Sequence, residues 1–291
     1  MTDRVAVGLV GAGGWADMVH APALAAGPDT RLAGVWARRP EAAAELAAKH
    51  GTVPYERLDD LLTACEAVAF SVPPDVQAEL AVRAARAGKH VLLEKPLAMD
   101  LAGAERLADA IGSAGVASQM VFTLRYSSAA RDFLSRVPAL EPVGGRAAFV
   151  SPVLSGGVFA TPWRLERGAL LDLGPHVVDM LDAALGRVVG VRAHGDPLRW
   201  VGMLLDHETG AVSEASISMA GGGDLPPASV QVYGPGGWAD LSWDVVGDDT
   251  FATVVAEFAA TVRAGGGHPL DAQHGLHIQQ ILSAAQSDLE K

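Results

Sequence analysis

Two polar residues four positions apart, Asp172 and His176, occur in an Asp-x-Gly-x-His segment. On a helix this spacing places both side chains on one face, and Pro175 is tolerated only in a first turn, which predicts a helix that begins near Asp172. A histidine can take up or release a proton near neutral pH, and a carboxylate can hold a hydroxyl group. Asp179, on the same face, could orient the imidazole or be a surface carboxylate. Taken singly, Asp172 could be only the N-cap of the helix, and His176 a hydrogen-bonded core residue.

A lysine follows the short apolar run 90–93 in the sequence Glu94-Lys95-Pro96. The run predicts a strand, and ligands bind beyond the carboxyl ends of strands in a doubly wound sheet. Lys95 is therefore expected to meet a bound ligand. Its ammonium group could stabilise negative charge on a reacting oxygen, and could relay a proton if the site lowers its pKa. An isolated lysine at this point would more simply be a surface residue at a strand end.

A glycine-rich turn follows the apolar run 5–10, and the segment 11–16 has the pattern G-x-G-x-x-A. Gly11 would permit the tight turn, Gly13 would let a pyrophosphate approach the backbone, and Ala16 would let the next helix pack closely. The helix N-terminus would supply N–H groups for the phosphates. Glycines that merely allow a turn are the alternative, but the strand–turn–helix context favours dinucleotide binding.

The choice of cofactor depends on the end of the second predicted strand, where Ala37 is followed by Arg38 and Arg39. Sites that prefer NAD usually place an acidic residue there to bind the ribose hydroxyl. Without a carboxylate to repel a 2′-phosphate, and with two guanidinium groups to bind one, NADP fits better than NAD. The competing interpretation is that both arginines are solvated surface residues.

The elements that must position these residues are of two kinds. Up to about residue 120, short apolar strands alternate with helices of about ten residues, which is typical of a doubly wound parallel sheet. The strands expected in this part are 5–10, 31–36, 67–72 and 90–93, and the helices run from the glycine turn to about 26 and over 41–50, 76–87 and 102–113.

After residue 120, strand-like runs follow one another without helices between them, which favours an antiparallel sheet. The expected strands are 146–153, 188–193, 199–206, 211–220, 229–233 and 238–243; the expected helices are 172–185, 249–264 and 272–289, and 155–167 is expected to be a loop. The sequence thus predicts an α/β Rossmann domain with a doubly wound parallel sheet at 1–120. It predicts an α+β domain with a mostly antiparallel open sheet, for substrate binding and oligomerisation, at 121–291.

Several segments, in this order, resemble the Gfo/Idh/MocA family of oxidoreductases (glucose–fructose oxidoreductase, inositol dehydrogenase and their relatives). They are His20-Ala21-Pro22-Ala23-Leu24, Ser71-Val72-Pro73-Pro74, residues 88–98 with Glu94-Lys95-Pro96, Phe122-Thr123-Leu124-Arg125-Tyr126 as a domain-crossing strand, Trp163-Arg164, residues 168–179, and Ile281-Leu282-Ser283-Ala284-Ala285. The Glu-Lys-Pro and Asp-x-Gly-x-His segments are the specific ones.

The resemblance implies an NAD(P)-dependent dehydrogenase or reductase that acts on a CH–OH group of a sugar, inositol or related small hydroxy compound. His176 would be the acid/base, Lys95 would polarise the reacting oxygen, and Asp172 would orient the substrate. Substrate contacts are expected from these three residues and from Arg125 and Trp163, which could as well serve in packing. Cofactor contacts are expected from Gly11, Gly13, Gly14, Trp15, Ala37, Arg38, Arg39, Ser71, Pro73, Glu94 and Lys95.

The chain departs from the family pattern at three positions. Gln77 stands where a histidine is frequent, Thr123 where an asparagine is common, and Arg167 replaces one glycine before the Asp-x-Gly-x-His segment. The chain of 291 residues is also shorter than most members, so a trimmed second domain is expected. The departures leave the expected fold intact and the substrate open.

Composition narrows the classes of partner. The net charge of −12 disfavours nucleic acid and anionic membranes. Cys65 is the single cysteine, so neither an intrachain disulfide nor a cysteine-based metal site is expected. No stretch approaches the roughly 20 apolar residues of a membrane span, and the N-terminus does not resemble a signal peptide. We therefore expect a cytoplasmic enzyme without a metal.

Two other functions remain open on the same scaffold. One is a glycosidase that oxidises and re-reduces its substrate with a tightly held NAD, without net redox change. The other is a non-catalytic dinucleotide-binding sensor, which would have no need of Lys95, Asp172 and His176 together. An open antiparallel sheet leaves one broad face to cover. In the proteins that this sequence resembles, that face pairs with another subunit, so the resemblance implies a homodimer or homotetramer formed through the C-terminal sheet.

Overall fold

A computed structural model describes residues 4–157, 159–243 and 249–291. Contacts divide the chain into two compact units. The first unit comprises Met1–Val121 with Asp248–Leu276, and the second comprises Phe122–Gly247 with His277–Lys291. We describe each unit by itself.

The first unit is built on a six-stranded sheet in which all strands are parallel, in the order β3-β2-β1-β4-β5-β6. Its strands are β1 (Val5–Val10), β2 (Thr30–Trp36), β3 (Pro54–Tyr55), β4 (Ala67–Phe70), β5 (His90–Glu94) and β6 (Ser118–Val121). Every residue of β1, β4 and β6 is buried, because helices cover both faces of the sheet. The doubly wound parallel sheet expected from the apolar runs is confirmed.

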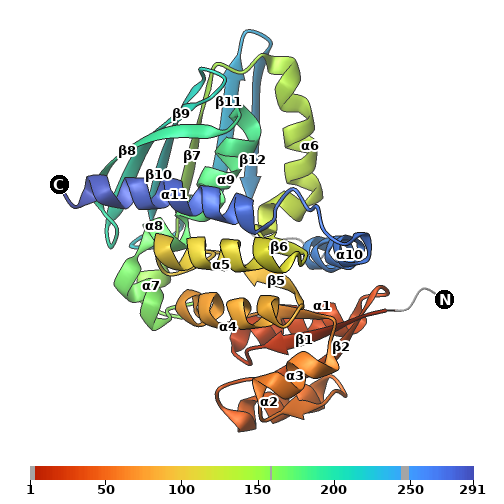
Figure 1. Ribbon diagram of the computed structural model, residues 1–291. Helices are drawn as coiled ribbons and strands as arrows, with labels where there is room; N and C mark the ends of the chain where they lie inside the picture. Colours follow the sequence, from red (N-terminus) through yellow and green to blue (C-terminus); the bar gives the residue numbers. More distant parts are fainter. Residues whose placement is uncertain (1–3, 158, 244–248) are drawn as a thin grey trace. The chain divides into compact units, whose positions relative to one another are not determined.

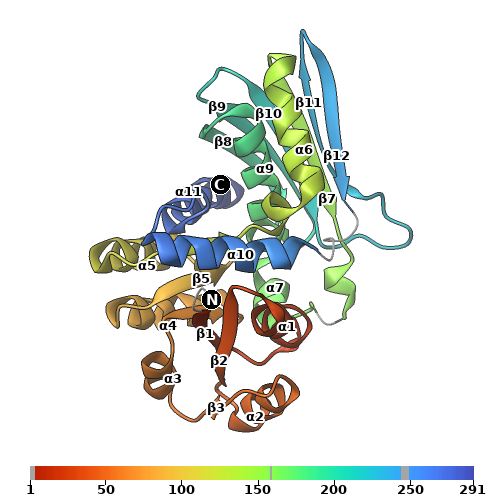
Figure 2. The ribbon, with the colours of Figure 1, turned by 90° about the vertical axis from the view of Figure 1, so that its right-hand side faces the viewer.

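Helices α3, α4 and α5 cover one face of this sheet, and α1, α2 and α10 cover the other (Figure 2). Their bounds are α1 (Ala21–Ala26), α2 (Pro40–Lys49), α3 (Leu58–Ala64), α4 (Pro74–Arg86), α5 (Leu101–Ala114) and α10 (Asp249–Ala264). Helices α2 and α4 begin with a proline, whose missing N–H has no partner in a first turn in any case. In the doubly wound arrangement, the glycine turn after β1 and Lys95 after β5 both follow the carboxyl ends of parallel strands.

The segment that follows residue 248 returns to the first unit beside β6. The side chain of Gln119 donates a hydrogen bond to the backbone oxygen of Val254 at 2.9 Å, and the backbone N–H of Met120 donates to Leu270 O at 2.7 Å. These long-range bonds hold α10, and the start of α11 (Ala272–Leu289), within the first unit. Residues 277–289 of α11 belong to the second unit.

The second unit contains a six-stranded sheet in the order β12-β11-β7-β10-β9-β8 (Figure 1). Its strands are β7 (Gly144–Val150), β8 (Val188–Asp196), β9 (Trp200–His207), β10 (Val212–Ser218), β11 (Ala228–Gly234) and β12 (Gly237–Trp243). Only the β7–β10 pair is parallel, so the mostly antiparallel sheet is confirmed. Buried and exposed residues alternate along β9 and β10, as expected for a sheet with one covered face.

The helical segments of the second unit differ from the sequence-based prediction at three points. Residues 155–167 were expected to form a loop, but α7 (Pro162–Arg167) starts with its proline at N1. The expected domain-crossing strand 122–126 is instead a 3₁₀ turn, Thr123–Tyr126, in which all residues but one are buried, so no alternation is present. The predicted helix 172–185 is divided into α8 (Ala169–Asp172) and α9 (Gly174–Leu185).

The remaining short elements of this unit are α6 (Ser128–Arg136) and the 3₁₀ turns Val137–Leu140 and Val153–Ser155. Helix α9 packs on β7, β10 and β11 and covers the buried face of the sheet (Figure 1). Among the helices that the structure describes, none combines the length and the hydropathy that a membrane crossing requires.

Candidate functional site

The glycine turn leaves β1 at Gly11, which has a φ of +120°. A Cβ atom at this position would lie 2.2 Å from the backbone oxygen of Ser71, so only glycine fits. At Gly13 a Cβ would meet nothing within 4 Å, so packing inside the protein does not require this glycine. An open backbone at this point suits the close approach of a pyrophosphate. The turn therefore fits a dinucleotide, and it continues into a π-helical turn, Ala16–His20, whose Ala16 is fully buried.

The residues after β2 are placed beside this turn. The backbone N–H of Gly11 donates to Trp36 O at 2.8 Å, which ties the turn to the last residue of β2. Ala37 is half-buried, and Arg38 and Arg39 are exposed. Within the described part of the chain, neither guanidinium group takes part in a hydrogen bond or an ion pair. Both arginines are thus accessible, which agrees with a 2′-phosphate contact and equally with a solvated surface.

Glu94, at the end of β5, is bonded to the segment that follows the glycine turn. Its Oε1 accepts a hydrogen bond from the indole Nε1 of Trp15 at 2.7 Å and lies 2.7 Å from Nε2 of His20. The side chain of His20 is 1% exposed and that of Glu94 13% exposed, so the contact is shielded from water. Phe251 of α10 meets both rings edge-on, with centroids 5.7 Å from each. The residue before Lys95 is therefore held against the predicted cofactor turn.

The backbone around Lys95 is held from a second direction. Gln77 of α4 is fully buried, and its amide bonds to the backbone of Glu94, Pro96 and Leu97. Lys95 itself is half-buried, and its peptide bond to Pro96 is cis. Ser71 is half-buried and Pro73 exposed, directly after β4. Gly11, Trp15, Ser71 and Lys95 thus follow neighbouring strands of one sheet.

In the second unit, Asp172 is paired with an arginine that we did not single out from the sequence. Arg164 Nε lies 3.0 Å from Asp172 Oδ1, as an ion pair rather than a well-aligned hydrogen bond. The Arg164 side chain also donates to Thr161 Oγ1 at 3.1 Å and lies over the ring of Trp163, 4.5 Å from its centroid. Trp163, expected to contact substrate, is buried. Leu173, not Asp172, is the N-cap residue of α9.

His176 follows in the first turn of α9, and its ring lies 6.2 Å from that of Phe149 on β7. Asp179 accepts a hydrogen bond from Nη1 of Arg125 at 2.9 Å, and its side chain is 1% exposed. The interpretation of Asp179 as a surface carboxylate is therefore wrong. Its effect on the imidazole of His176 stays a prediction.

The structure thus brings the predicted residues together in two groups. The first unit carries the glycine turn, Glu94 and Lys95; the second carries Asp172, His176, Trp163 and Arg125. Sequence reasoning missed the roles of His20, Arg164 and Phe251. The contacts of His20 with Glu94 and of Arg164 with Asp172 join residues 74 and 8 positions apart, and no periodic pattern signals such pairs.

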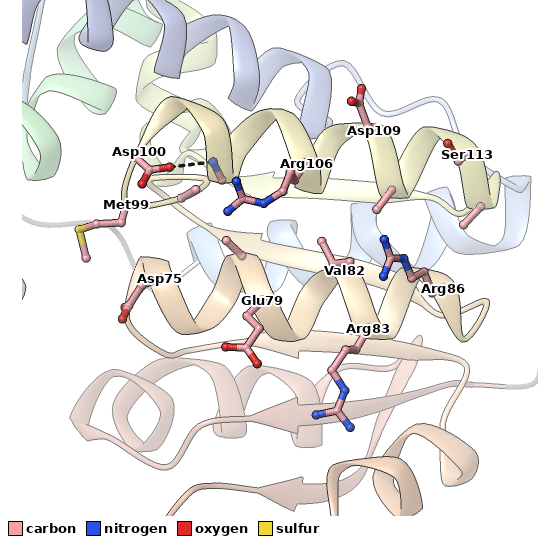
Figure 3. A pocket seen from close by; sticks show the side chains of 15 residues that line it. Asp75, Glu79, Val82, Arg83, Arg86, Met99, Asp100, Arg106, Asp109 and Ser113 are labelled. Atoms are coloured by element: carbon pink, nitrogen blue, oxygen red, sulfur yellow. Dashed lines mark hydrogen bonds between the residues drawn. The ribbon is translucent and has the colours of Figure 1, made fainter.

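A groove of about 1010 Å³ lies between α4 and α5 on the outside of the first unit (Figure 3). Its charged side chains are of both signs, namely Asp75, Glu79, Arg83, Arg86, Asp100, Arg106 and Asp109. None of the predicted site residues lines it. Some of its charges are already engaged: Arg83 pairs with Asp59 at 2.8 Å, and Asp100 caps α5 by accepting from Gly103 N. We assign it no role.

No cluster of three or more potential metal-ligating His, Cys, Asp or Glu residues occurs among the residues that the structure describes.

Comparison with known proteins shows a family match for the first part of the chain. Residues 5–122 match a family model described as an oxidoreductase family with an NAD-binding Rossmann fold. The dTDP-3,4-didehydro-2,6-dideoxy-alpha-D-glucose 3-reductase of Streptomyces violaceoruber is 32% identical over 216 residues, which are 72% of this chain and 60% of that protein. The match to this curated relative therefore spans less than two thirds of its length.

Solved structures show the same fold. GenD2 from gentamicin A biosynthesis, in complex with NAD, matches with a TM-score of 0.87 and 24% identity, over 100% of this chain and 95% of that chain. KijD10, a 3-ketoreductase from Actinomadura kijaniata in complex with TDP-benzene and NADP, matches with a TM-score of 0.80 and 23% identity, over 99% and 98%. The Rossmann domain and the second, mostly antiparallel domain are thereby confirmed. Residues 5–122 thus match the model of the Gfo/Idh/MocA family of oxidoreductases, which agrees with the resemblance seen in the sequence.

Proposed function

We propose that this protein is an NAD(P)-dependent oxidoreductase that moves a hydride between the nicotinamide and a secondary alcohol or ketone of a sugar, inositol or related hydroxy compound. One observation carries the proposal. Lys95 directly follows Glu94, and the carboxylate of Glu94 is bonded to Trp15 of the glycine turn at 2.7 Å. A cation suited to polarising a reacting oxygen is thus joined to a turn suited to a dinucleotide.

The cofactor would be held by the glycine turn and by the residues after β2, β4 and β5. Gly11 permits the tight turn, Gly13 leaves the backbone open for the pyrophosphate, and Arg38 and Arg39 offer guanidinium groups to a 2′-phosphate. We therefore propose NADP as the preferred cofactor, with NAD as the second choice. When bound, the nicotinamide accepts or supplies the hydride.

The roles of the three polar residues follow from their chemistry. His176 takes the proton from the substrate hydroxyl during oxidation and returns it to the carbonyl oxygen during reduction. Lys95 stabilises negative charge on that oxygen. Asp172, fixed by its ion pair with Arg164, accepts a hydrogen bond from a neighbouring substrate hydroxyl. The buried Trp163 and the Asp179-bound Arg125 then shape the surroundings of these groups.

The class of substrate is supported by the relatives. The relative from Streptomyces violaceoruber is named as a 3-reductase of a dTDP-linked dideoxyglucose derivative. KijD10 is named as a 3-ketoreductase. We propose a sugar or polyol for this chain as well. The cytoplasmic location expected from the sequence stays a prediction.

The first test needs no substrate. NADPH and NADH are titrated separately into the purified protein, freed of bound cofactor, and quenching of tryptophan fluorescence is followed. We expect saturable binding that is tighter for NADPH. Failure of both cofactors to bind would remove the basis of the proposal, because the glycine turn would then be only a turn.

The second test is a panel of sugars, polyols, sugar phosphates and sugar nucleotides with the preferred cofactor, read by nicotinamide absorbance. On the substrate found, Lys95→Ala should lower turnover by about 100-fold or more. Lys291→Ala, at an exposed lysine near the C-terminus, is the matched control and should retain full turnover. Full turnover by Lys95→Ala would contradict the role of Lys95. Glycoside cleavage without net absorbance change would favour the redox-neutral glycosidase instead.

We also propose that the second unit mediates a homodimer or homotetramer through the exposed face of its sheet. Large apolar side chains stand on exposed positions of the strands, namely Val189, Trp200, Leu204, Val212, Tyr233 and Trp238. Tyr233 and Trp238 stack with centroids 6.4 Å apart, and Trp238 is 60% exposed. Exposed apolar side chains that gather on one surface often mark an interface. Light scattering should show an oligomer that Trp238→Asp weakens; a monomeric wild-type chain would refute this assignment.

A further inference from the structure

Gln77 lies in the first turn of α4 and is fully buried. Its Oε1 accepts a hydrogen bond from the backbone N–H of Glu94 at 2.8 Å, and its Nε2 donates to the backbone oxygen of the same residue at 2.7 Å. Nε2 also lies 3.2 Å from the carbonyl oxygens of Pro96 and Leu97. These contacts, which we call the Gln77 clasp, engage the backbone on both sides of Lys95.

The Gln77 clasp takes the place of a neighbouring strand at the end of β5, on the side that faces β4. The pairing of β4 with β5 ends at Ala69 and Leu92, whereas on its other side β5 remains paired as far as Glu94 with Val121 of β6. Beyond Leu92, the side of β5 that faces β4 therefore has backbone groups without a strand partner. Buried N–H and C=O groups are seldom left unpaired. A glutamine amide offers one acceptor and two donor hydrogens, so it can bond both groups of Glu94 as a neighbouring strand would.

A second anchor acts on the same residue. The carboxylate of Glu94 is bonded to Trp15 and lies against His20, so the side chain of Glu94 is held independently of its backbone. With the backbone fixed by α4 and the side chain fixed by the glycine-turn segment, the next residue along the chain has little freedom. That residue is Lys95.

We propose that Gln77 is a positioning residue that sets the place and the chemical environment of the Lys95 ammonium group. The proposal rests on the proposed function, which gives Lys95 its task, but it concerns a separate step: how the chain holds the lysine. It also agrees with the departure at position 77, because glutamine, like histidine, offers a donor and an acceptor to the end of β5.

The variants separate positioning from simple packing. Gln77→Met keeps the length and volume of the side chain and removes every bond of the clasp. Gln77→Glu keeps an acceptor for the N–H of Glu94 but places negative charge against three carbonyl oxygens. Gln77→His retains one donor and one acceptor and serves as the conservative rescue.

Gln119→Met is the matched control. Gln119 is also fully buried in the first unit, on β6, and its amide bonds to Val254 O at 2.9 Å. The substitution removes a buried amide of the same size without touching the backbone near Lys95. If Gln119→Met and Gln77→Met lose similar thermal stability, that loss reports only the removal of a buried amide. A change at Lys95 that occurs in Gln77→Met and not in Gln119→Met is then an effect of the clasp.

The readout is the reactivity of Lys95 itself. The full-length protein is labelled at one fixed pH with a trace of an amine-acylating reagent. The labelling rate of each lysine with and without NADPH, its labelling profile, is quantified by peptide mass spectrometry. Lys291, whose side chain is 73% exposed and pairs with Asp288 at 2.7 Å, is the internal reference for a surface lysine. We expect a Lys95 profile that differs from that of Lys291 in the wild type and in Gln119→Met. In Gln77→Met and Gln77→Glu the labelling rate of Lys95 should move toward that of Lys291, because a lysine whose backbone is no longer held meets the reagent as a surface lysine does. Gln77→His should restore it at least in part.

Two outcomes would overturn the proposal. One is a Lys95 profile in Gln77→Met that equals the wild-type profile while the melting temperature falls as in Gln119→Met, because Gln77 would then be purely structural. The other is a wild-type Lys95 that labels like Lys291. Failure of the proposed function is a different result, namely absence of cofactor binding or full turnover by Lys95→Ala, and the labelling measurement does not depend on either.

Discussion

Arg164 Nε lies 3.0 Å from Asp172 Oδ1, and only 7% of the Asp172 side chain is exposed. The carboxylate expected to orient the substrate thus has a fixed counter-charge from the preceding helix, α7. Arg164 is in turn held over the indole of Trp163. The ion pair thus connects Asp172 with the Trp163-Arg164 segment, which the sequence presents as a separate feature.

Removing this counter-charge should destabilise the protein. Arg164→Met removes the guanidinium counter-charge from a nearly buried carboxylate, and we expect the free energy of unfolding to fall by about 2 kcal/mol. This is below the range for a fully buried pair, because Arg164 is partly exposed. Urea unfolding measures the change. Arg136→Met removes an exposed pair with Asp132 and is the control, with an expected effect under about 0.5 kcal/mol. Equal effects of the two substitutions would show that the Arg164–Asp172 pair adds no stability.

The two glycines of the turn should respond differently to the same substitution. Gly11→Ala places a Cβ 2.2 Å from Ser71 O at a φ of +120°, so it should lower the melting temperature. Gly13→Ala meets no atom within 4 Å, so it should leave stability unchanged while weakening dinucleotide binding by about tenfold or more, through contact with the pyrophosphate. Differential scanning calorimetry and the NADPH titration check the pair. Undiminished binding by Gly13→Ala would place the cofactor elsewhere.

Cofactor preference should follow the residues after β2. Ala37→Asp introduces a carboxylate that repels a 2′-phosphate and can bind the ribose hydroxyl, so the ratio of NADPH to NADH affinity should fall. Arg38→Ala together with Arg39→Ala should weaken NADPH binding by about 10- to 100-fold, the value of one or two charge-assisted hydrogen bonds, and leave NADH binding nearly unchanged. An unchanged ratio in all these variants would mean that the arginines are solvated surface residues.

A pH effect on stability is expected from His90. Burial lowers the pKa of His90 below its ordinary value of 6.5, although Glu66 acts in the opposite direction. Its Nδ1 accepts a hydrogen bond from Ala117 N at 2.9 Å, which requires that nitrogen to be unprotonated. Because the folded-state pKa is lowered, the unfolded chain binds the proton more readily than the folded chain. The stability contributed by unprotonated His90 is therefore present above about pH 6.5 and is lost as the pH falls through the folded-state pKa.

The corresponding variant is His90→Gln. The loss of unfolding free energy between pH 7 and pH 5 should be smaller in His90→Gln than in the wild type, as measured by urea unfolding at each pH. His194→Gln, at an exposed histidine of β8, is the control and should keep the wild-type slope. The assignment fails if both variants show the same slope as the wild type.

Local sequence patterns were sufficient for the architecture. Apolar runs such as 5–10 and 67–70 are buried on both faces of a parallel sheet, and the glycine pattern at 11–16 forms the strand-to-helix turn that it predicts. Strand-like runs without helices between them predicted the second sheet. These features depend on neighbouring residues, so periodicity and turn chemistry determine them.

The sequence by itself predicted a dinucleotide-dependent chemistry for Gly11, Lys95, Asp172 and His176, because those residue types stand in specific short motifs. Only the tertiary structure decided which side chains hold them: Gln77 and His20 on Glu94, Arg164 on Asp172, and Arg125 on Asp179. Each of these contacts joins residues that are distant along the chain or lie in different elements. Whether such side chains meet depends on how strands and helices pack, and no local pattern of residues contains that information.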